Sequence, residues 1–136
     1  MDSPAALGHA VVDALNRGDI DGLHRLRVTQ DEYLSWIWPA FPASRPPYNF
    51  TPDFAWSNLN KKCLLGASSW IEQYGSQNLT FVDMEFNRPT EAYKDFKLLR
   101  GTVLTIQKAS GEKVELRILG SVVKKDNRYK LLSYEE

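Results

Sequence analysis

The first part of the chain has the hydrophobic spacing of short helices. Ser3 followed by Pro4 is typical of a helix start, and apolar residues then recur at intervals of three and four positions until Gly18. Asp19 can cap a second, short helix directly afterwards. Two helices joined by a tight link are therefore expected within the first 28 residues.

A third helix and a proline-rich segment follow. Thr29 and Glu32 have the spacing of a capping box, which predicts a helix over 30–37. Five of the seven prolines lie in the segment 39–52, and this density favours a stiff, extended loop. The same segment carries three aromatic residues, so we expect it to pack on the body of the protein.

The longest predicted helix covers 52–74. Thr51 is a suitable cap, Pro52 fits the first turn, and Gly75 follows the last apolar position. At about 1.5 Å per residue this helix is roughly 35 Å long, enough to cross a small sheet. Cys63, the only cysteine, lies among its apolar positions and is expected to be a buried, inert thiol.

The hydrophobic period changes to that of strands in the second half of the chain. Four strands are expected, at 79–86, 96–107, 114–124 and 128–134. Helices followed by an antiparallel meander are the α+β pattern. With 136 residues, the chain is expected to form a single domain, 1–136, in which the helices cover one face of the sheet.

The face that carries the helices depends on the hairpin turn at 110–111. A two-residue turn there places Thr105 beside Leu116 and Val103 beside Ile118. The helix-facing positions would then be Leu99, Val103, Thr105, Val114, Leu116, Ile118, Val122 and Leu131.

The opposite face is too apolar to be left in water, which predicts a homodimer with two-fold symmetry. The interface residues would be Leu104, Leu119, Leu132 and Tyr134. The alternative is an amphipathic sheet that stays solvated, because apolar atoms cover much of any protein surface.

Two further features of the strands are ambiguous in the sequence. Arg100 and Arg117 fall on the predicted outer face, as rim charges of the dimer or as groups of a pocket. Gly101 falls opposite Gly120, where missing side chains allow a strong bend of the sheet or leave room for a ligand. We favour the bend.

Charge and composition exclude several classes of protein. The 17 Lys and Arg residues balance 17 Asp and Glu residues, so no electrostatic footprint for nucleic acid or an anionic membrane is expected. One cysteine and two isolated histidines predict neither a metal site nor a cofactor. No apolar run reaches the roughly 20 residues of a membrane span, so a soluble chain is expected. The first residues do not resemble a signal peptide. They are also compatible with a leader that has been removed, so the sequence does not define the compartment.

The order of elements resembles the nuclear-transport-factor-2-like superfamily, the cone-shaped fold shared with ketosteroid isomerase. The stretch AVVDALNRGD at 10–19 is similar to the opening helix of those proteins, and the chain looks like an uncharacterised bacterial branch. The resemblance implies N-terminal helices packed on the concave face of a curved antiparallel sheet. It also implies a cavity between them, where enzymes of the family place a carboxylate base and hydrogen-bond donors.

The chain offers weak candidates for such acid–base chemistry. Asp83 and Glu85 share one face of the first strand and could supply a base whose pKa is raised by burial. Tyr33 or Tyr48 could donate a hydrogen bond to a developing enolate. The alternative, which we favour, is that the two carboxylates lie on a solvated or interfacial strand face.

Aromatic residues are concentrated between positions 33 and 56, which hold eight of the sixteen in the chain. Aromatic walls with a few polar groups suit the recognition of a flat or apolar small molecule. The predicted ligand-binding residues are Tyr33, Trp36, Trp38, Tyr48, Asn49, Trp56 and Lys61, with Arg45 as a further polar group. The alternative is that these aromatics only plug the open end of the cone.

Noncatalytic binding of a small apolar or aromatic ligand, or service as an interaction domain, is the favoured function. An isomerase, dehydratase or hydrolase that acts by acid–base chemistry in the same cavity is the alternative. A purely structural or assembly domain is a third hypothesis, and it predicts a large interface without a pocket.

Overall fold

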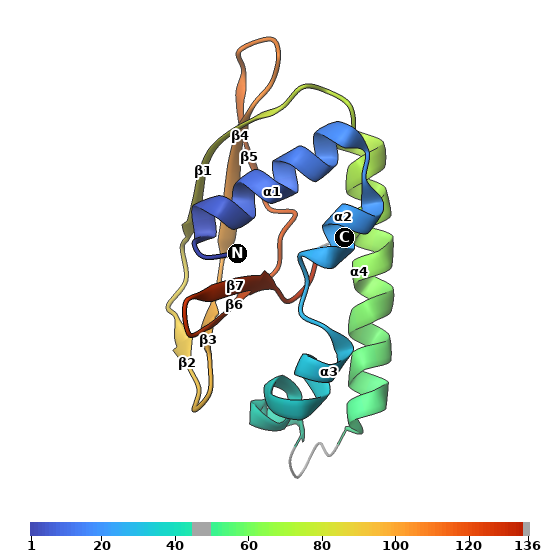
Figure 1. Ribbon diagram of the computed structural model, residues 1–136, viewed down its shortest axis with the longest axis vertical. Helices are drawn as coiled ribbons and strands as arrows, with labels where there is room; N and C mark the ends of the chain where they lie inside the picture. The colour runs from blue at the N-terminus through green and yellow to red at the C-terminus, as the bar shows by residue number, and fades with distance from the viewer. Residues whose placement is uncertain (45–49, 135–136) are drawn as a thin grey trace.

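The protein has the predicted α+β architecture, with helices in the first half and antiparallel strands in the second (Figure 1). The structure is a computed structural model that describes residues 1–44 and 50–134. The first helix, α1 (Pro4–Arg17), lies against the strands and against α4 (Pro52–Tyr74), which runs along one side of the molecule.

The first two helices begin and end where the sequence predicts. Ser3 caps α1 (Pro4–Arg17), and Gly18 ends it in the left-handed conformation at φ 62°. Asp19 caps α2 (Ile20–Arg25) by accepting a hydrogen bond from a backbone amide in its first turn. The short range of these capping interactions explains why the sequence alone predicts them.

The third helical stretch is continuous but changes its pitch. Thr29 and Glu32 form the predicted capping box, with hydrogen bonds of 3.1 and 2.9 Å, at the start of α3 (Gln30–Glu32). A π-helical turn, η1 (Tyr33–Ile37), continues from it. Two short 3-10 turns follow, η2 (Trp38–Ala40) and η3 (Pro42–Ser44).

Helix α4 (Pro52–Tyr74) has the predicted bounds. The Thr51 hydroxyl accepts a hydrogen bond of 3.3 Å from the Phe54 amide, and Gly75 terminates the helix. Cys63 is fully buried on its inner side, as expected.

The strands form two small sheets in place of one meander. The strands are β1 (Thr80–Phe86), β2 (Glu91–Ala92), β3 (Lys97–Leu99), β4 (Thr102–Gln107), β5 (Lys113–Leu116), β6 (Val122–Lys125) and β7 (Arg128–Leu131). Their orders are β1-β4-β5 and β2-β3-β6-β7. The predicted long strands are therefore each divided, one at Arg100 and Gly101, the other over 117–121.

The predicted register of the β4–β5 hairpin is wrong by one residue. Leu104 pairs with Leu116, where the two-residue turn would have placed Thr105. The Lys108 amide donates to the Glu112 carbonyl at 2.8 Å, so the loop contains three residues. A shift of one residue turns every side chain of a strand to the other face.

The dimer surface predicted from that register is consequently wrong. Leu104, Leu119 and Tyr134 are only 0%, 3% and 1% exposed and belong to the main core with α1 and α2. The Tyr134 hydroxyl donates to the Leu23 carbonyl at 2.6 Å. Leu132 is half-buried against the smaller core cluster under η1. These side chains hold the chain together and cannot contact a second copy.

The exposed face of the β1-β4-β5 sheet is largely polar. Val103 pairs with Glu85 and Thr105 with Asp83, so both residues lie on the side opposite Leu104 and Ile106, although Val103 is only 7% exposed. The side chains of Asp83, Glu85 and Glu115 are exposed on it. The argument that a homodimer would bury an apolar surface on this face therefore no longer holds.

Candidate functional site

The predicted aromatic cluster divides into two groups with different roles. Trp36 and Phe41 pack against Phe96 at ring-centroid distances of 5.3 and 6.2 Å, and Phe41 also contacts Tyr93 at 5.6 Å. This group fills the space between η1 and the β2-β3-β6-β7 sheet. The second group surrounds a groove on the outside.

The second group forms an apolar groove between η1, η2 and the first turns of α4. We call it the aromatic groove, and its volume is about 430 Å³. It is lined by Tyr33, Trp38, Phe50, Phe54, Ala55, Asn58, Leu59 and Lys62. Phe50 and Phe54 are 48% and 53% exposed and stack with centroids 5.8 Å apart. Large aromatic side chains this exposed mark a surface suited to a ligand or partner.

Two residues that line the aromatic groove, Trp38 and Tyr33, carry hydrogen-bond donors. The Trp38 indole Nε1 is buried and has no hydrogen-bond partner within the described residues. Burial raises the pKa of Tyr33 to about 12, so its phenol stays protonated at neutral pH. An apolar groove with a few polar donors is the usual composition of a small-molecule site.

Helical geometry decides which α4 residues reach the groove. Ala55, Asn58, Leu59 and Lys62 are spaced by three and four positions and share one side of the helix. Lys61, predicted as a ligand-binding residue, is exposed and does not line the groove. The sequence interpretation missed Asn58 and Leu59, although their spacing from the aromatic positions is the signal that could have found them.

Other predicted ligand-binding residues lie elsewhere. Trp56 packs edge-on against Tyr33 at 5.6 Å and beneath the Arg27 guanidinium at 5.5 Å, and it does not line the groove. Arg45, Tyr48 and Asn49 are outside the described residues. Of the predicted residues that the structure describes, only Tyr33 and Trp38 line the groove, although Trp56 packs on Tyr33.

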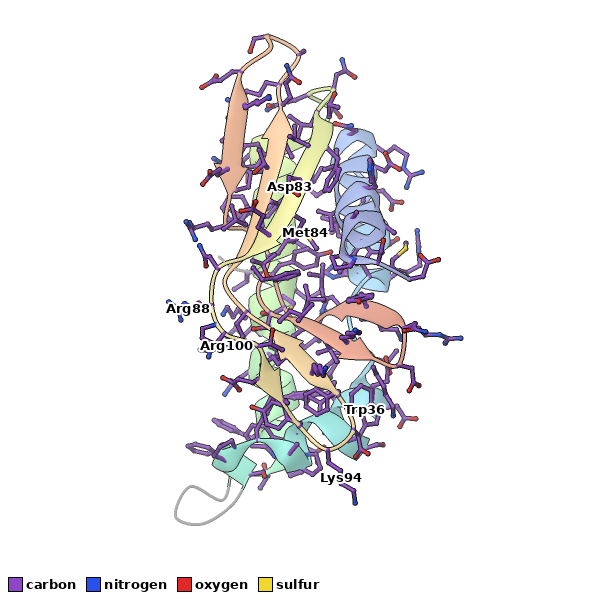
Figure 2. The ribbon with its side chains drawn as sticks, turned by 90° about the vertical axis from the view of Figure 1, so that its left-hand side faces the viewer. Trp36, Asp83, Met84, Arg88, Lys94 and Arg100 are labelled. Carbon is purple, nitrogen blue, oxygen red and sulfur yellow. The ribbon has the colours of Figure 1, made fainter. Side chains whose placement is uncertain are left out.

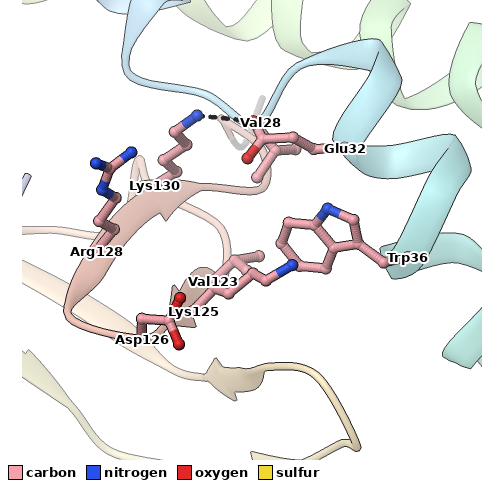
Figure 3. Close-up of a pocket in the computed structure, with 8 residues that line it drawn as sticks. All are labelled: Val28, Glu32, Trp36, Val123, Lys125, Asp126, Arg128 and Lys130. Carbon is pink, nitrogen blue, oxygen red and sulfur yellow. Dashed lines mark hydrogen bonds and ion pairs between the residues drawn. The ribbon is translucent and has the colours of Figure 1, made fainter.

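Trp36 lines a separate, charged cleft of about 300 Å³ (Figure 3). The Lys125 ammonium lies 4.2 Å from the centroid of its ring, a cation–π contact. Lys130 and Glu32 form an ion pair of 2.8 Å across the cleft. Lys125, Lys130 and Glu32 are thus engaged with neighbouring side chains, whereas Asp126 and Arg128 line the cleft as exposed charges.

The ion pair of this cleft also changes the acidity of Glu32. Burial acts to raise the pKa of Glu32, but hydrogen bonds from Lys130 and from Thr29 outweigh it and hold the pKa below its ordinary value. The carboxylate is therefore charged at neutral pH and supports both the capping box and the pair.

The structure does not assemble the predicted acid–base group. Asp83 and Glu85 are exposed on β1, whereas Tyr33 belongs to η1 at the other end of the molecule, near Trp36 (Figure 2). The neighbouring Asp83 raises the pKa of Glu85, through a shared hydrogen bond and like-charge repulsion, with little contribution from burial. The aromatic groove, which Tyr33 lines, is lined by neither Asp83 nor Glu85.

Residues 1–44 and 50–134 show neither a metal-binding cluster nor a helix suited to a membrane. No three His, Cys, Asp or Glu side chains lie close enough to hold a metal ion. None of the helices in this part of the chain combines the length and hydrophobicity needed to cross a bilayer.

Comparison of the chain with protein-family models, curated proteins and solved structures finds no significant match in any of the three.

Proposed function

We propose that this chain is a noncatalytic domain of the nuclear-transport-factor-2-like cone type that binds a small apolar or aromatic molecule in the aromatic groove. The observation that carries the proposal is the open groove of about 430 Å³ whose wall includes two aromatic side chains about half exposed. Phe50 and Phe54 expose apolar surface to water. A bound apolar molecule would bury this surface, which is favourable in free energy.

The cone type is proposed from the arrangement of elements. Three helical stretches, a proline-rich crossing and one long helix precede strands that bend at Gly101 and over 117–121. The α1 helix packs against β1, and the main core lies between helices and strands. Because Trp36, Phe41, Tyr93 and Phe96 fill the space between η1 and the β2-β3-β6-β7 sheet, the groove is the site proposed for the ligand.

The test compares two serine substitutions on α4 with 1-naphthol as a flat, apolar probe. Phe54→Ser removes an exposed wall of the groove, and Leu65→Ser removes an equally exposed apolar side chain outside it, at 55% exposure against 53%. Calorimetric titration should show saturable binding, with a Kd about tenfold higher for Phe54→Ser and unchanged for Leu65→Ser.

A second readout locates the probe. The NMR resonance of the Trp38 indole N–H should shift on titration, and that of Trp70, outside the groove, should not. The proposal is wrong if the parent protein shows no saturable binding, or if both serine variants lose the probe equally.

A further inference from the structure

Three of the connections between strands, those after β1, β3 and β5, come together on one side of the molecule. The chain leaves β1 at Asn87, and it passes from β3 to β4 through Arg100 and Gly101. The Asn87 amide donates to the Gly101 carbonyl at 3.0 Å, and the Arg88 amide to the Arg100 carbonyl at 3.3 Å. The third break is the segment 117–121, which connects β5 to β6. Each break contributes one arginine.

These arginines, Arg88, Arg100 and Arg117, line one cavity of about 310 Å³. Gly101 and Gly120 also line it, so no side chain stands between the arginines and the backbone at these two positions. None of the described residues that line the cavity is acidic. In Figure 2, Arg88 and Arg100 lie next to each other at the bend and extend away from α1.

The charges in this cavity are not balanced locally. Arg100 forms a 2.8 Å ion pair with Glu91, whose other oxygen accepts a hydrogen bond from the Tyr93 hydroxyl, so the guanidinium is held in place. Arg88 and Arg117 have no carboxylate partner within the described residues. A chain with zero formal net charge thus concentrates unpaired positive charge at one point.

We propose that this arginine cavity binds the phosphate group of a small molecule. Guanidinium groups match phosphate oxygens with two parallel hydrogen bonds, and they keep their charge at any physiological pH. A phosphate monoester has about two negative charges and three free oxygens, which suits three arginines better than the single charge of a carboxylate. This site is separate from the aromatic groove and does not depend on the function proposed for it.

The experiment titrates the full chain with inorganic phosphate and with glycerol 3-phosphate, at constant ionic strength, by NMR of the arginine Nε–H groups. Arg88→Gln and Arg117→Gln should each raise the Kd about tenfold, and the double variant should abolish saturable binding. Both side chains are exposed, so the variants should fold, which circular dichroism checks.

Arg17→Gln is the matched control, because it removes the same charge from a 68% exposed arginine at the end of α1, outside the cavity. Its Kd should equal that of the parent. Equal weakening by all three single substitutions would mean a general charge effect and would overturn the proposal. Absence of saturable phosphate binding to the parent would overturn it as well.

The two probes distinguish the source of the phosphate. Tighter binding of glycerol 3-phosphate supports a phosphorylated small molecule, as proposed, because part of the cavity then holds the organic group. Binding of inorganic phosphate alone overturns that identification. The remaining possible occupant is a second copy of the chain, which light scattering tests. If no phosphate binds and Arg117→Gln lowers the mass of an assembly, the cavity binds a second copy and the proposal is wrong.

Discussion

Glu85 shows how one neighbour changes the chemistry of an exposed residue. Its carboxyl group is on the surface of β1, and the Asp83 carboxylate beside it raises its pKa above the ordinary value of 4.5. A raised pKa in the folded protein means that the charged form is repelled there, so the repulsion lowers stability at neutral pH.

Glu85→Gln is therefore expected to raise the free energy of unfolding at pH 7. The gain should shrink as the pH falls, because the repulsion acts in full above the raised pKa and is absent below the ordinary value of 4.5. Urea denaturation across this range measures it. Glu72→Gln, at an exposed position of α4, is the control. A gain that does not vary with pH would contradict the explanation.

Arg27 is a second residue whose contribution to stability depends on its surroundings. It is only 6% exposed, and one guanidinium nitrogen donates to the Asn60 side chain at 3.1 Å. Its Nε and Nη2 atoms are buried without partners in the part of the chain that the structure describes. A buried cation without a carboxylate is costly.

Arg27→Met should therefore leave the free energy of unfolding unchanged or raise it by about 1 kcal/mol, because methionine keeps the packing on Trp56 and removes the charge. Arg27→Ala should lower it by about 2 kcal/mol, since it leaves a cavity. Both are measured by urea denaturation. A loss larger than about 2 kcal/mol for the methionine variant would show that the charge is needed.

At the scale of elements, the break between β3 and β4 requires glycine. Gly101 has φ 69°, and a Cβ there would lie 2.3 Å from the Asn87 side-chain oxygen and 3.0 Å from the Arg88 amide nitrogen. Gly111, in the β4–β5 loop, has φ 91°, but a Cβ there would meet nothing closer than 4.0 Å. Substitution at Gly111 would therefore strain only the backbone, whereas substitution at Gly101 would add a steric clash.

Gly101→Ala is expected to lower the free energy of unfolding by more than about 2 kcal/mol, and Gly111→Ala by about 1 kcal/mol, the cost of the strained backbone alone. Thermal and urea denaturation measure the difference. Gly101→Ala should also weaken phosphate binding, because Asn87 and Arg88 must move to make room. Equal losses at the two positions would contradict a steric role for the bend.

At the scale of the whole molecule, the charges on the outer face of the β1-β4-β5 sheet oppose the pairing of two copies through it. A two-fold contact through it would bring Asp83, Glu85 and Glu115 of two copies close together, with like charges opposed. Light scattering at neutral pH and low salt is therefore expected to give the mass of one chain, 15.5 kDa. Twice that mass would show that another surface associates, and Leu65→Ser, at an exposed apolar position of α4, would then test that helix.

The candidate sites were only partly predictable. Tyr33 and Trp38 were found because aromatic residues are dense in their segment. The sequence did not indicate Arg88 as a site residue. Its neighbours in the sequence do not distinguish an arginine that lines a cavity from one that only faces solvent. Its place beside Arg100 and Arg117 depends on hydrogen bonds between segments that are distant in the sequence.

The sequence by itself determined the helices, since Ser3, Asp19, Thr29 and Thr51 cap their helices through contacts within a few residues. It also determined the α+β order, because periodicity is local. Only the tertiary structure decided which face of β4 is buried, since one extra residue in the hairpin loop reverses it. Gly101 and Gly120 already indicated a bend in the sequence, but only the tertiary structure decided which arginines meet at the breaks, because that depends on packing between distant segments.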